Sequence, residues 1–280
     1  MFIQRTVVSV YSKCLTTILA CWVFLAVYGN AYAFDSVALQ HEAVSLTQAE
    51  RAYLKEHKEV TLCVDPDWVP YEHIDASGKH VGIAADLLAL IEARTGVEFQ
   101  LVPTRDWNES LEYSKAGKCQ ALSFLNQSVE RSEWLIFTSP LFSDPNVFIT
   151  REEHPFISDP ATLENESIVF PEGTAMEGLI RERYPNLEVM LAKSEDETLD
   201  MVSSRRSSMT MRSLIVAAYT IRKDGLFNLK IAGQLPMYTN HLRIGVSKSE
   251  GVLRNILDKG VQPISPHEKG RAVHQHATIN

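Results

Sequence analysis

The stretch Asp65-Pro-Asp-Trp-Val-Pro-Tyr-Glu72 decides the fold, because it stands directly after the apolar run Val60-Thr-Leu-Cys-Val64. A short buried strand that ends in a loop of acidic and aromatic side chains is the usual way in which an α/β sheet builds a ligand crevice. Further along, Ser128 and Arg131 form a Ser-x-x-Arg turn after the apolar segment 120–125. An arginine at a second strand end can hold a carboxylate with two parallel N–H···O bonds. The sequence therefore predicts a crevice for a small acid.

Strands and helices alternate through the first half of the chain. Apolar and alternating patterns predict strands at 60–64, 97–101 and 120–125, and helices at 47–57, 84–94 and 106–116. A capping box from Thr47 to Glu50 opens the first helix, and Gly96 ends the second. Strand–helix repeats with short connections indicate a doubly wound, mostly parallel sheet.

The same pattern restarts after the polar stretch 151–159. Strands are predicted at 168–170, 189–191, 208–211 and 229–232, with helices that begin near 174, 194 and 213. The chain then returns through a strand at 242–246 and a helix at 252–258. Two similar α/β units are therefore expected in one chain.

These residues, in this order, resemble the bacterial extracellular solute-binding proteins of family 3, over roughly residues 47–268. That family shares its fold with the periplasmic sensor domains of some histidine kinases and diguanylate cyclases, and Thr47–Leu54 and Cys63–Trp68 look more like the sensor branch. The resemblance implies a two-lobed periplasmic binding protein-like fold of type II. Lobe one would comprise 58–148 plus 243–280, and lobe two 149–242. Two crossing strands between the lobes would make a hinge.

The resemblance also implies a ligand site to which both lobes contribute. Lobe one supplies an acid, an aromatic ring, an arginine and neutral hydrogen-bonding groups, and lobe two supplies free N–H groups at a helix start. By position in this sequence, the expected ligand contacts are Asp65, Trp68, Asn126, Ser128, Arg131, Gly173, Thr174 and Ser213.

Each of these residues also has a purely structural interpretation. Arg131 can form a surface ion pair with Glu130 or Glu133, and Trp68 can be a core aromatic. Gly173-Thr174 can be an ordinary helix cap. Within the whole pattern, we favour ligand binding for Arg131.

One position departs from the family pattern. Amino-acid binders normally carry an acidic residue after the lobe-two strand at 208–211, where it receives an α-ammonium group, but this chain has Arg212-Ser213 there. If Arg212 points into the cleft, two arginines favour a dicarboxylate or another anion. If it points to solvent, as exposed arginines mostly do, Ser213 is only a helix cap. We expect the second arrangement.

The first 33 residues are typical of a signal peptide. Arg5 and Lys13 form a basic start, 14–28 is an apolar run, and Ala31-Tyr-Ala33 predicts cleavage after Ala33. An uncleaved anchor and a lipoprotein modified at Cys21 are the alternatives. Export to the periplasm is expected, with 34–57 as a leader that ends in a short helix.

Export would leave Cys63 and Cys119 as an even pair in an oxidising compartment. They belong to strands that neighbour each other in the implied sheet, so we predict a disulfide. The alternative is two small buried residues that pack as apolar side chains.

Charge and composition limit the kinds of molecule that this protein is expected to bind. Removal of Arg5 and Lys13 takes the formal charge from −8 to −10, and an acidic surface repels the phosphates of nucleic acids. No cysteine or histidine spacing predicts a zinc site, and we expect no cofactor. The expected protein is a monomer that binds a small carboxylate-bearing or amino-acid-like solute. Its partner is an ABC permease or a membrane signalling protein.

Two further readings stay open. The same fold hosts a periplasmic cyclohexadienyl dehydratase, for which Glu172 would be the acid, although we expect no catalysis. The second reading is the truncated sensory half of a diguanylate cyclase or histidine kinase. After Pro266 the apolar periodicity is weak, and His267, His274 and His276 are expected in a solvated tail.

Overall fold

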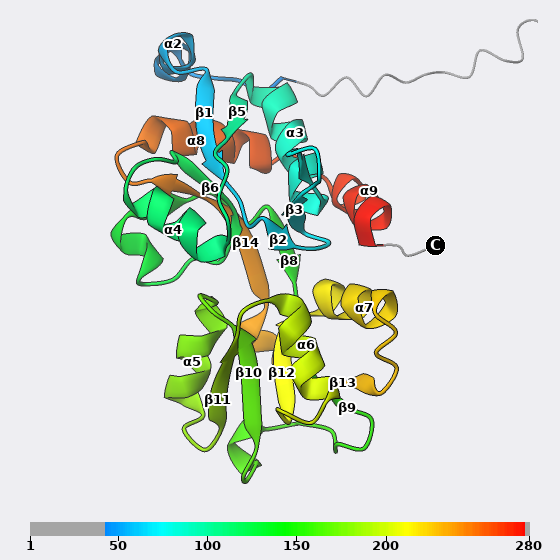
Figure 1. Ribbon diagram of the computed structural model, residues 1–280. Helices are drawn as coiled ribbons and strands as arrows, with labels where there is room; N and C mark the ends of the chain where they lie inside the picture. The colour runs from blue at the N-terminus through cyan, green and yellow to red at the C-terminus, as the bar shows by residue number, and fades with distance from the viewer. Residues whose placement is uncertain (1–42, 278–280) are drawn as a thin grey trace, which may run out of the picture. The chain divides into compact units, whose positions relative to one another are not determined.

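A computed structural model describes residues 43–277 (Figure 1). The predicted signal peptide and its cleavage after Ala33 lie outside the described residues. The first described helix is α2 (Gln48–Glu56), and its capping box is present: the Glu50 N–H donates to Thr47 Oγ1 over 3.2 Å, and the Thr47 N–H donates to the Glu50 carboxylate over 2.6 Å. The sequence pattern predicted this start because it depends only on neighbours three residues apart.

The first sheet has the strand order β5-β1-β6-β14-β7. Strand β1 (Glu59–Cys63) runs parallel to β5 (Glu98–Leu101) and β6 (Ala121–Leu125). Strand β14 (Asn240–Ser247) is antiparallel to β6 and to β7 (Leu135–Phe137). Helices α3 (Ile83–Thr95) and α8 (Gly251–Val261) share one apolar core, and α4 (Trp107–Lys115) packs in another. We call this part lobe one.

The second sheet has the order β11-β10-β12-β9-β13, with β10 parallel to β11 and β12, and β9 antiparallel to β12 and β13. Its strands are β9 (Asn146–Arg151), β10 (Ser167–Pro171), β11 (Glu188–Ala192), β12 (Met209–Ser213) and β13 (Leu229–Gln234). Helix α5 (Ala175–Arg183) packs in one core, and α6 (Glu195–Ser203) and α7 (Leu214–Lys223) pack in another. We call this part lobe two. Short 3₁₀ turns lie at Arg131–Glu133, Pro160–Thr162 and Pro236–Tyr238.

The chain passes between the sheets twice. Strand β8 (Phe142–Asp144) pairs antiparallel with 240–242 at the start of β14 and leads through Pro145 into β9. The predicted lobe boundary at 148 falls inside β9, which already pairs with lobe-two strands, because the chain crosses at Pro145; the boundary at 242 falls inside β14, whose start pairs with β8. The α/β fold with two lobes and two crossing segments is therefore confirmed.

The sequence patterns did not predict strands β7, β8 and β9, and they missed two further features. The first is a small sheet of β2 (Asp67–Trp68), β3 (Glu72–Ile74) and β4 (His80–Val81). The second is helix α9 (Pro266–Ala277), where we expected a solvated tail. That expectation was wrong because polar contacts dock α9 on α3: Glu268 lies 2.6 Å from the Arg94 guanidinium, and His276 Nε2 lies 2.9 Å from Asp86 Oδ2.

Within 43–277, no helix combines the length and the apolar character that a membrane crossing requires. The same residues contain no group of three or more His, Cys, Asp or Glu side chains placed to hold a metal ion.

Candidate ligand site

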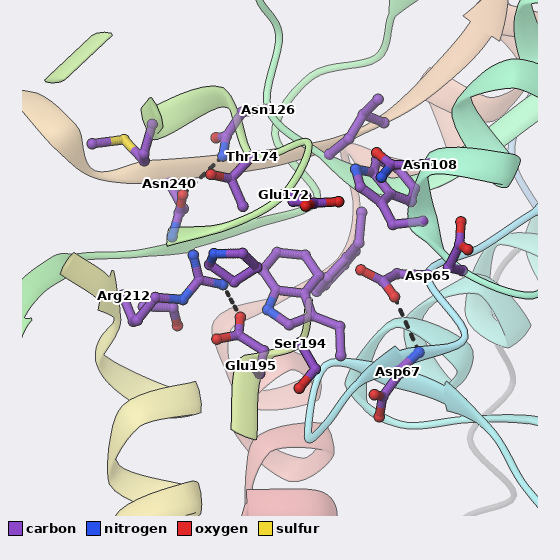
Figure 2. A pocket seen from close by; sticks show the side chains of 18 of the residues that line it. Asp65, Asp67, Asn108, Asn126, Glu172, Thr174, Ser194, Glu195, Arg212 and Asn240 are labelled. Carbon is purple, nitrogen blue, oxygen red and sulfur yellow. Dashed lines mark hydrogen bonds and ion pairs between the residues drawn. The ribbon is translucent and has the colours of Figure 1, made fainter. Parts of the chain in front are cut away.

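A cavity of about 510 Å³ lies where the two lobes face each other (Figure 2). Its walls come from the loops after β1, β6, β10 and β12, which are carboxyl ends of parallel strands, and from the starts of α4, α5 and α6. This volume falls in the range of pockets that enclose small molecules. Of the expected ligand contacts, Asp65, Trp68, Asn126, Arg131, Thr174 and Ser213 line the cavity, whereas Ser128 and Gly173 do not.

Asp65 stands two residues after β1, with a half-buried side chain. Its Oδ1 accepts the Asp67 N–H over 3.0 Å, and its own N–H donates to the Glu72 carboxylate over 3.0 Å. Burial raises the pKa of Asp65 to about 7. The negative charges of Glu72 and Asp67 also raise this pKa, whereas the positive charge of the Arg212 guanidinium lowers it. The carboxyl group therefore carries only a partial charge at neutral pH.

Arg131 is a buried cation at the seam of the lobes. Its Nη1 donates to the Asn126 carbonyl over 2.8 Å, and its Nη2 approaches the Gly173 carbonyl of lobe two at 3.5 Å. Ser128 holds the turn, since its Oγ accepts the Arg131 backbone N–H. The surface ion-pair interpretation is wrong, because Arg131 is 7% exposed and forms no ion pair with any described residue. Burial lowers the pKa of Arg131 to about 10.

Trp68 packs as a core aromatic and also lines the cavity. Its ring meets Tyr71 edge-on at 4.7 Å between centroids, and it packs against the lobe-one core. It also lines the cavity, where its Nε1–H has no hydrogen-bond partner among the described residues. The indole is therefore a core aromatic with one polar edge left open.

The Gly173-Thr174 pair precedes α5. Thr174 is the N-cap residue, but its side chain makes no capping hydrogen bond, and its buried Oγ1 lacks a partner among residues 43–277. Gly173 has φ +79°, and a Cβ there would lie 2.4 Å from Asn108 Oδ1 of lobe one. Glycine thus permits both the backbone conformation and the close approach of the lobes.

Arg212 lies inside the cavity, so our expectation that it points to solvent was wrong. It is 6% exposed and forms an ion pair with Glu195, the first residue of α6. Strand β12 is central in its sheet, between β10 and β9, so its carboxyl end opens on the cavity instead of on solvent. Burial lowers the pKa of Arg212 to about 10, and the charges of Asp65 and Tyr71 oppose that shift.

Ser213 does more than cap a helix. Its Oγ accepts the Val216 N–H of α7 at 3.4 Å, lies 2.7 Å from the Tyr71 hydroxyl of lobe one, and donates to Asp144 beside the crossing. The Tyr71 hydroxyl also donates to Asp144, over 2.8 Å. This buried group of three side chains connects lobe one, the crossing strand β8 and lobe two.

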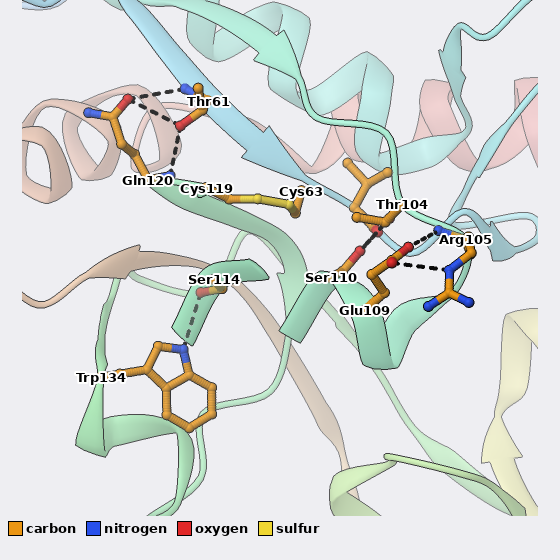
Figure 3. Close-up of a disulfide and its surroundings, with 11 residues drawn as sticks. Thr61, Cys63, Thr104, Arg105, Glu109, Ser110, Ser114, Cys119, Gln120 and Trp134 are labelled. Atoms are coloured by element: carbon orange, nitrogen blue, oxygen red, sulfur yellow. Dashed lines mark hydrogen bonds and ion pairs between the residues drawn. A yellow bond between two sulfur atoms is a disulfide. The ribbon is translucent and has the colours of Figure 1, made fainter. Parts of the chain in front are cut away.

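A disulfide joins Cys63 at the end of β1 to Cys119 just before β6, with the Cα atoms 5.8 Å apart (Figure 3). Both side chains are buried. The bond ties together two parallel strands of lobe one, two residues before Asp65.

The sequence and the fold of this chain are similar to those of known proteins. Residues 60–275 match the model of the bacterial extracellular solute-binding proteins, family 3. The chain belongs to this family. Among curated relatives, the virulence sensor protein BvgS of Bordetella pertussis is 22% identical over 234 residues, and the sensor protein EvgS of Escherichia coli O157:H7 is 20% identical over 236. These alignments cover 84% and 83% of this chain, but only 19% of each relative.

Solved structures show the same fold. The periplasmic domain of B. pertussis BvgS aligns with a TM-score of 0.77 at 21% identity, over 87% of this chain and 48% of that one. The VFT2 domain of BvgS aligns with a TM-score of 0.76 at 21% identity, over 83% and 99%. An arginine-bound ArgBP variant from T. maritima aligns with a TM-score of 0.64 at 18% identity, over 76% and 99%. The chain therefore has the Venus flytrap fold of family 3 solute-binding proteins and of sensor-kinase periplasmic domains.

Some cavity residues of this family 3 chain were not found from the sequence. Asn126 Nδ2 and Asn146 Nδ2 both donate to Asn240 Oδ1, over 2.8 and 3.1 Å, so three amides line the floor where the chain crosses. The available signal was a polar amide at the first position of two strands, at Asn146 and Asn240. Glu195 carried the weaker signal of an acid in the first turn of a capped helix.

Proposed function

We propose that this chain is a periplasmic ligand-sensing domain that holds a small carboxylate-bearing solute between its lobes. The observation that carries the proposal is Arg131, a buried guanidinium in the cavity wall that has no carboxylate partner within residues 43–277. A buried charge without a counter-charge is costly, and a solute carboxylate would supply that counter-charge through two parallel hydrogen bonds.

Sensing is favoured over transport by the relatives, since BvgS and EvgS are both named as sensor proteins. The chain spans about one fifth of their length. The partner we propose is a signalling protein in the membrane, with an ABC permease as the alternative. The periplasmic location in this proposal is supported by the matched BvgS domain, which is periplasmic.

The signal in this proposal is the closed state of the lobes. The Arg131–Gly173 contact and the Tyr71–Ser213 contact both join lobe one to lobe two. A solute held by Arg131, Asp65 and Trp68 on one side reaches Thr174 on the other only while these contacts persist. Its binding free energy therefore favours the closed state, which is the condition for a ligand-driven population shift.

Catalysis gains no support from the cavity. Glu172 lines it with an exposed side chain, and no hydrogen bond of that side chain to another described residue orients it as an acid. The relatives are sensor and binding proteins.

A thermal-shift screen against small carboxylates, amino acids and polyamines tests the proposal. A solute at about 100 times its Kd should stabilise the fold by about 2.7 kcal/mol. Arg131→Ala should cost roughly 2–5 kcal/mol of binding free energy, and Arg131→Lys should restore only part of it because an ammonium group lacks the planar fork. Arg206→Ala, at an exposed arginine paired with Asp200, is the control. Calorimetry that finds equal affinity in Arg131→Ala and wild type would exclude the role.

A further inference from the structure

Lobe two contributes four charged side chains to the cavity wall, the exposed Glu172 and Lys193 and the ion pair of Arg212 with Glu195, and their formal charges sum to zero. The Arg212 and Glu195 side chains are 8% and 11% exposed and come from the end of β12 and the start of α6 (Figure 2). Asp65, whose charge also acts on Arg212, has a pKa of about 7 and so adds only a partial charge at neutral pH. This side is polar but almost electrically balanced.

Several polar atoms of cavity-lining residues, three residues of lobe two and Trp68 of lobe one, have no hydrogen-bond partner in the described part of the chain. They are the donors Arg212 Nε and Trp68 Nε1, the hydroxyl of Thr174, and the carboxylate oxygen Oε2 of Glu195, whose Oε1 already pairs with the Arg212 guanidinium. All four residues line the cavity. Buried polar groups are normally satisfied, so donors and acceptors left open together indicate a ligand group that both accepts and donates.

The two sides of the cavity therefore differ. Arg131 forms no ion pair with any residue of 43–277, whereas Arg212 is paired with Glu195. An ammonium group beside the pair would be repelled by Arg212, and a second carboxylate would be repelled by Glu195. In a low-dielectric site such like-charge contacts select against the wrong partner.

We propose that Arg212 and Glu195 determine specificity, by selecting a solute with a carboxylate at one end and an uncharged donor–acceptor group, such as a carboxamide, at the other. This inference rests on the proposed function, since Arg131 must hold the carboxylate. The carboxamide oxygen accepts from Arg212 Nε–H or Trp68 Nε1–H, and its NH₂ group donates to Glu195.

Matched compounds that differ only in the group at the end opposite the carboxylate test the effect of the charge of that group. Glutarate, glutaramate and δ-aminovalerate share a carboxylate and a five-carbon chain but end in a carboxylate, a carboxamide and an ammonium group; succinate, succinamate and γ-aminobutyrate form the four-carbon set. Calorimetry on the wild type should show a carboxamide compound binding at least about tenfold tighter than its charged counterparts.

Substitutions of Glu195 or Arg212 should change the order of affinities among these compounds. Glu195→Gln leaves Arg212 unpaired and should make the dicarboxylate the best ligand, whereas Arg212→Gln leaves Glu195 unpaired and should favour the ammonium compound. The double variant removes both charges and should return the preference to the carboxamide. Arg206→Gln, at the exposed pair with Asp200, should leave the ranking unchanged.

The outcomes separate the two proposals. If charged-end compounds bind the wild type as tightly as the carboxamide, the inference is wrong while carboxylate binding by Arg131 stands. The same holds if the single variants keep the wild-type ranking. If a single variant has no cooperative melting transition, the inference is tested by the order of affinities among the compounds in the wild type and in the double variant. Absence of binding by every carboxylate in the wild type overturns both proposals.

Discussion

Replacing Asp65 with asparagine should stabilise the folded protein in mildly alkaline solution and change little in acid. The carboxyl group of Asp65 has a pKa of about 7 in the fold, against an ordinary value of 3.8, because burial disfavours its charged form. Asparagine has nearly the same shape, and its side-chain oxygen can still accept the Asp67 N–H that Asp65 Oδ1 accepts at 3.0 Å. The substitution therefore removes the ionisation and keeps the turn.

The sign follows from proton binding. Between the two pKa values the folded state keeps a proton that the unfolded chain has released, so the free energy of unfolding of the wild type falls as the pH rises from about 4 to about 7. The difference between the values is about 3 pH units, and each unit is worth 1.36 kcal/mol, so about 4 kcal/mol is the upper limit at pH 8. Because Asp65 is half-buried, we expect Asp65→Asn to gain roughly 1–3 kcal/mol there.

Urea denaturation of wild type and variant across this pH range measures the effect. Asp75→Asn is a control of opposite sign. The hydrogen bond from Ser77 lowers the pKa of Asp75 in the folded protein. The Asp75 carboxylate therefore stabilises the fold above its ordinary pKa, and this stabilisation is lost as the pH falls below that value. An Asp65→Asn gain of equal size at about pH 4 and about pH 8, or a wild type that is the more stable protein at high pH, would refute the reasoning.

Three further predictions concern the fold and its motion. Tyr71→Phe removes one of the hydrogen bonds that Asp144 accepts and should cost about 0.5–1.5 kcal/mol in urea denaturation; an unchanged midpoint would contradict this. Thiol labelling of denatured, unreduced protein should detect neither Cys63 nor Cys119, and reduction should expose both. Small-angle scattering should give a smaller radius of gyration with a confirmed solute than without it, and identical profiles would exclude ligand-driven closure.

Much of the fold was predictable because its signals are local. The capping box at Thr47 and the stop at Gly96 depend on residues within one helical turn, and both occur where expected. The strand–helix alternation depends on the period of apolar residues, which a short window contains. Helix α9 was missed because docking on α3 through Arg94 and Asp86 stabilises it, and its own sequence has little apolar periodicity.

The candidate site was predictable only in part, for the same reason. Strand ends could be located from the sequence, and Asp65, Asn126 and Arg131 were found because they follow such ends and fit a family pattern. Their contact with a solute remains a prediction. Glu195 and Asn240 could not be found this way, because their role depends on which distant loops lie opposite them.

By itself, then, the sequence determined the order of the elements, the two α/β units and the family, since each rests on short-range patterns or on residues in a known order. Tertiary structure alone decided the charge balance of the cavity. Arg212 was expected to face solvent, and only the central place of β12 and the arrival of Glu195 from α6 turned it into half of a buried ion pair. The physical reason is that the charge state and partners of a side chain depend on groups that folding brings close in space from distant parts of the chain.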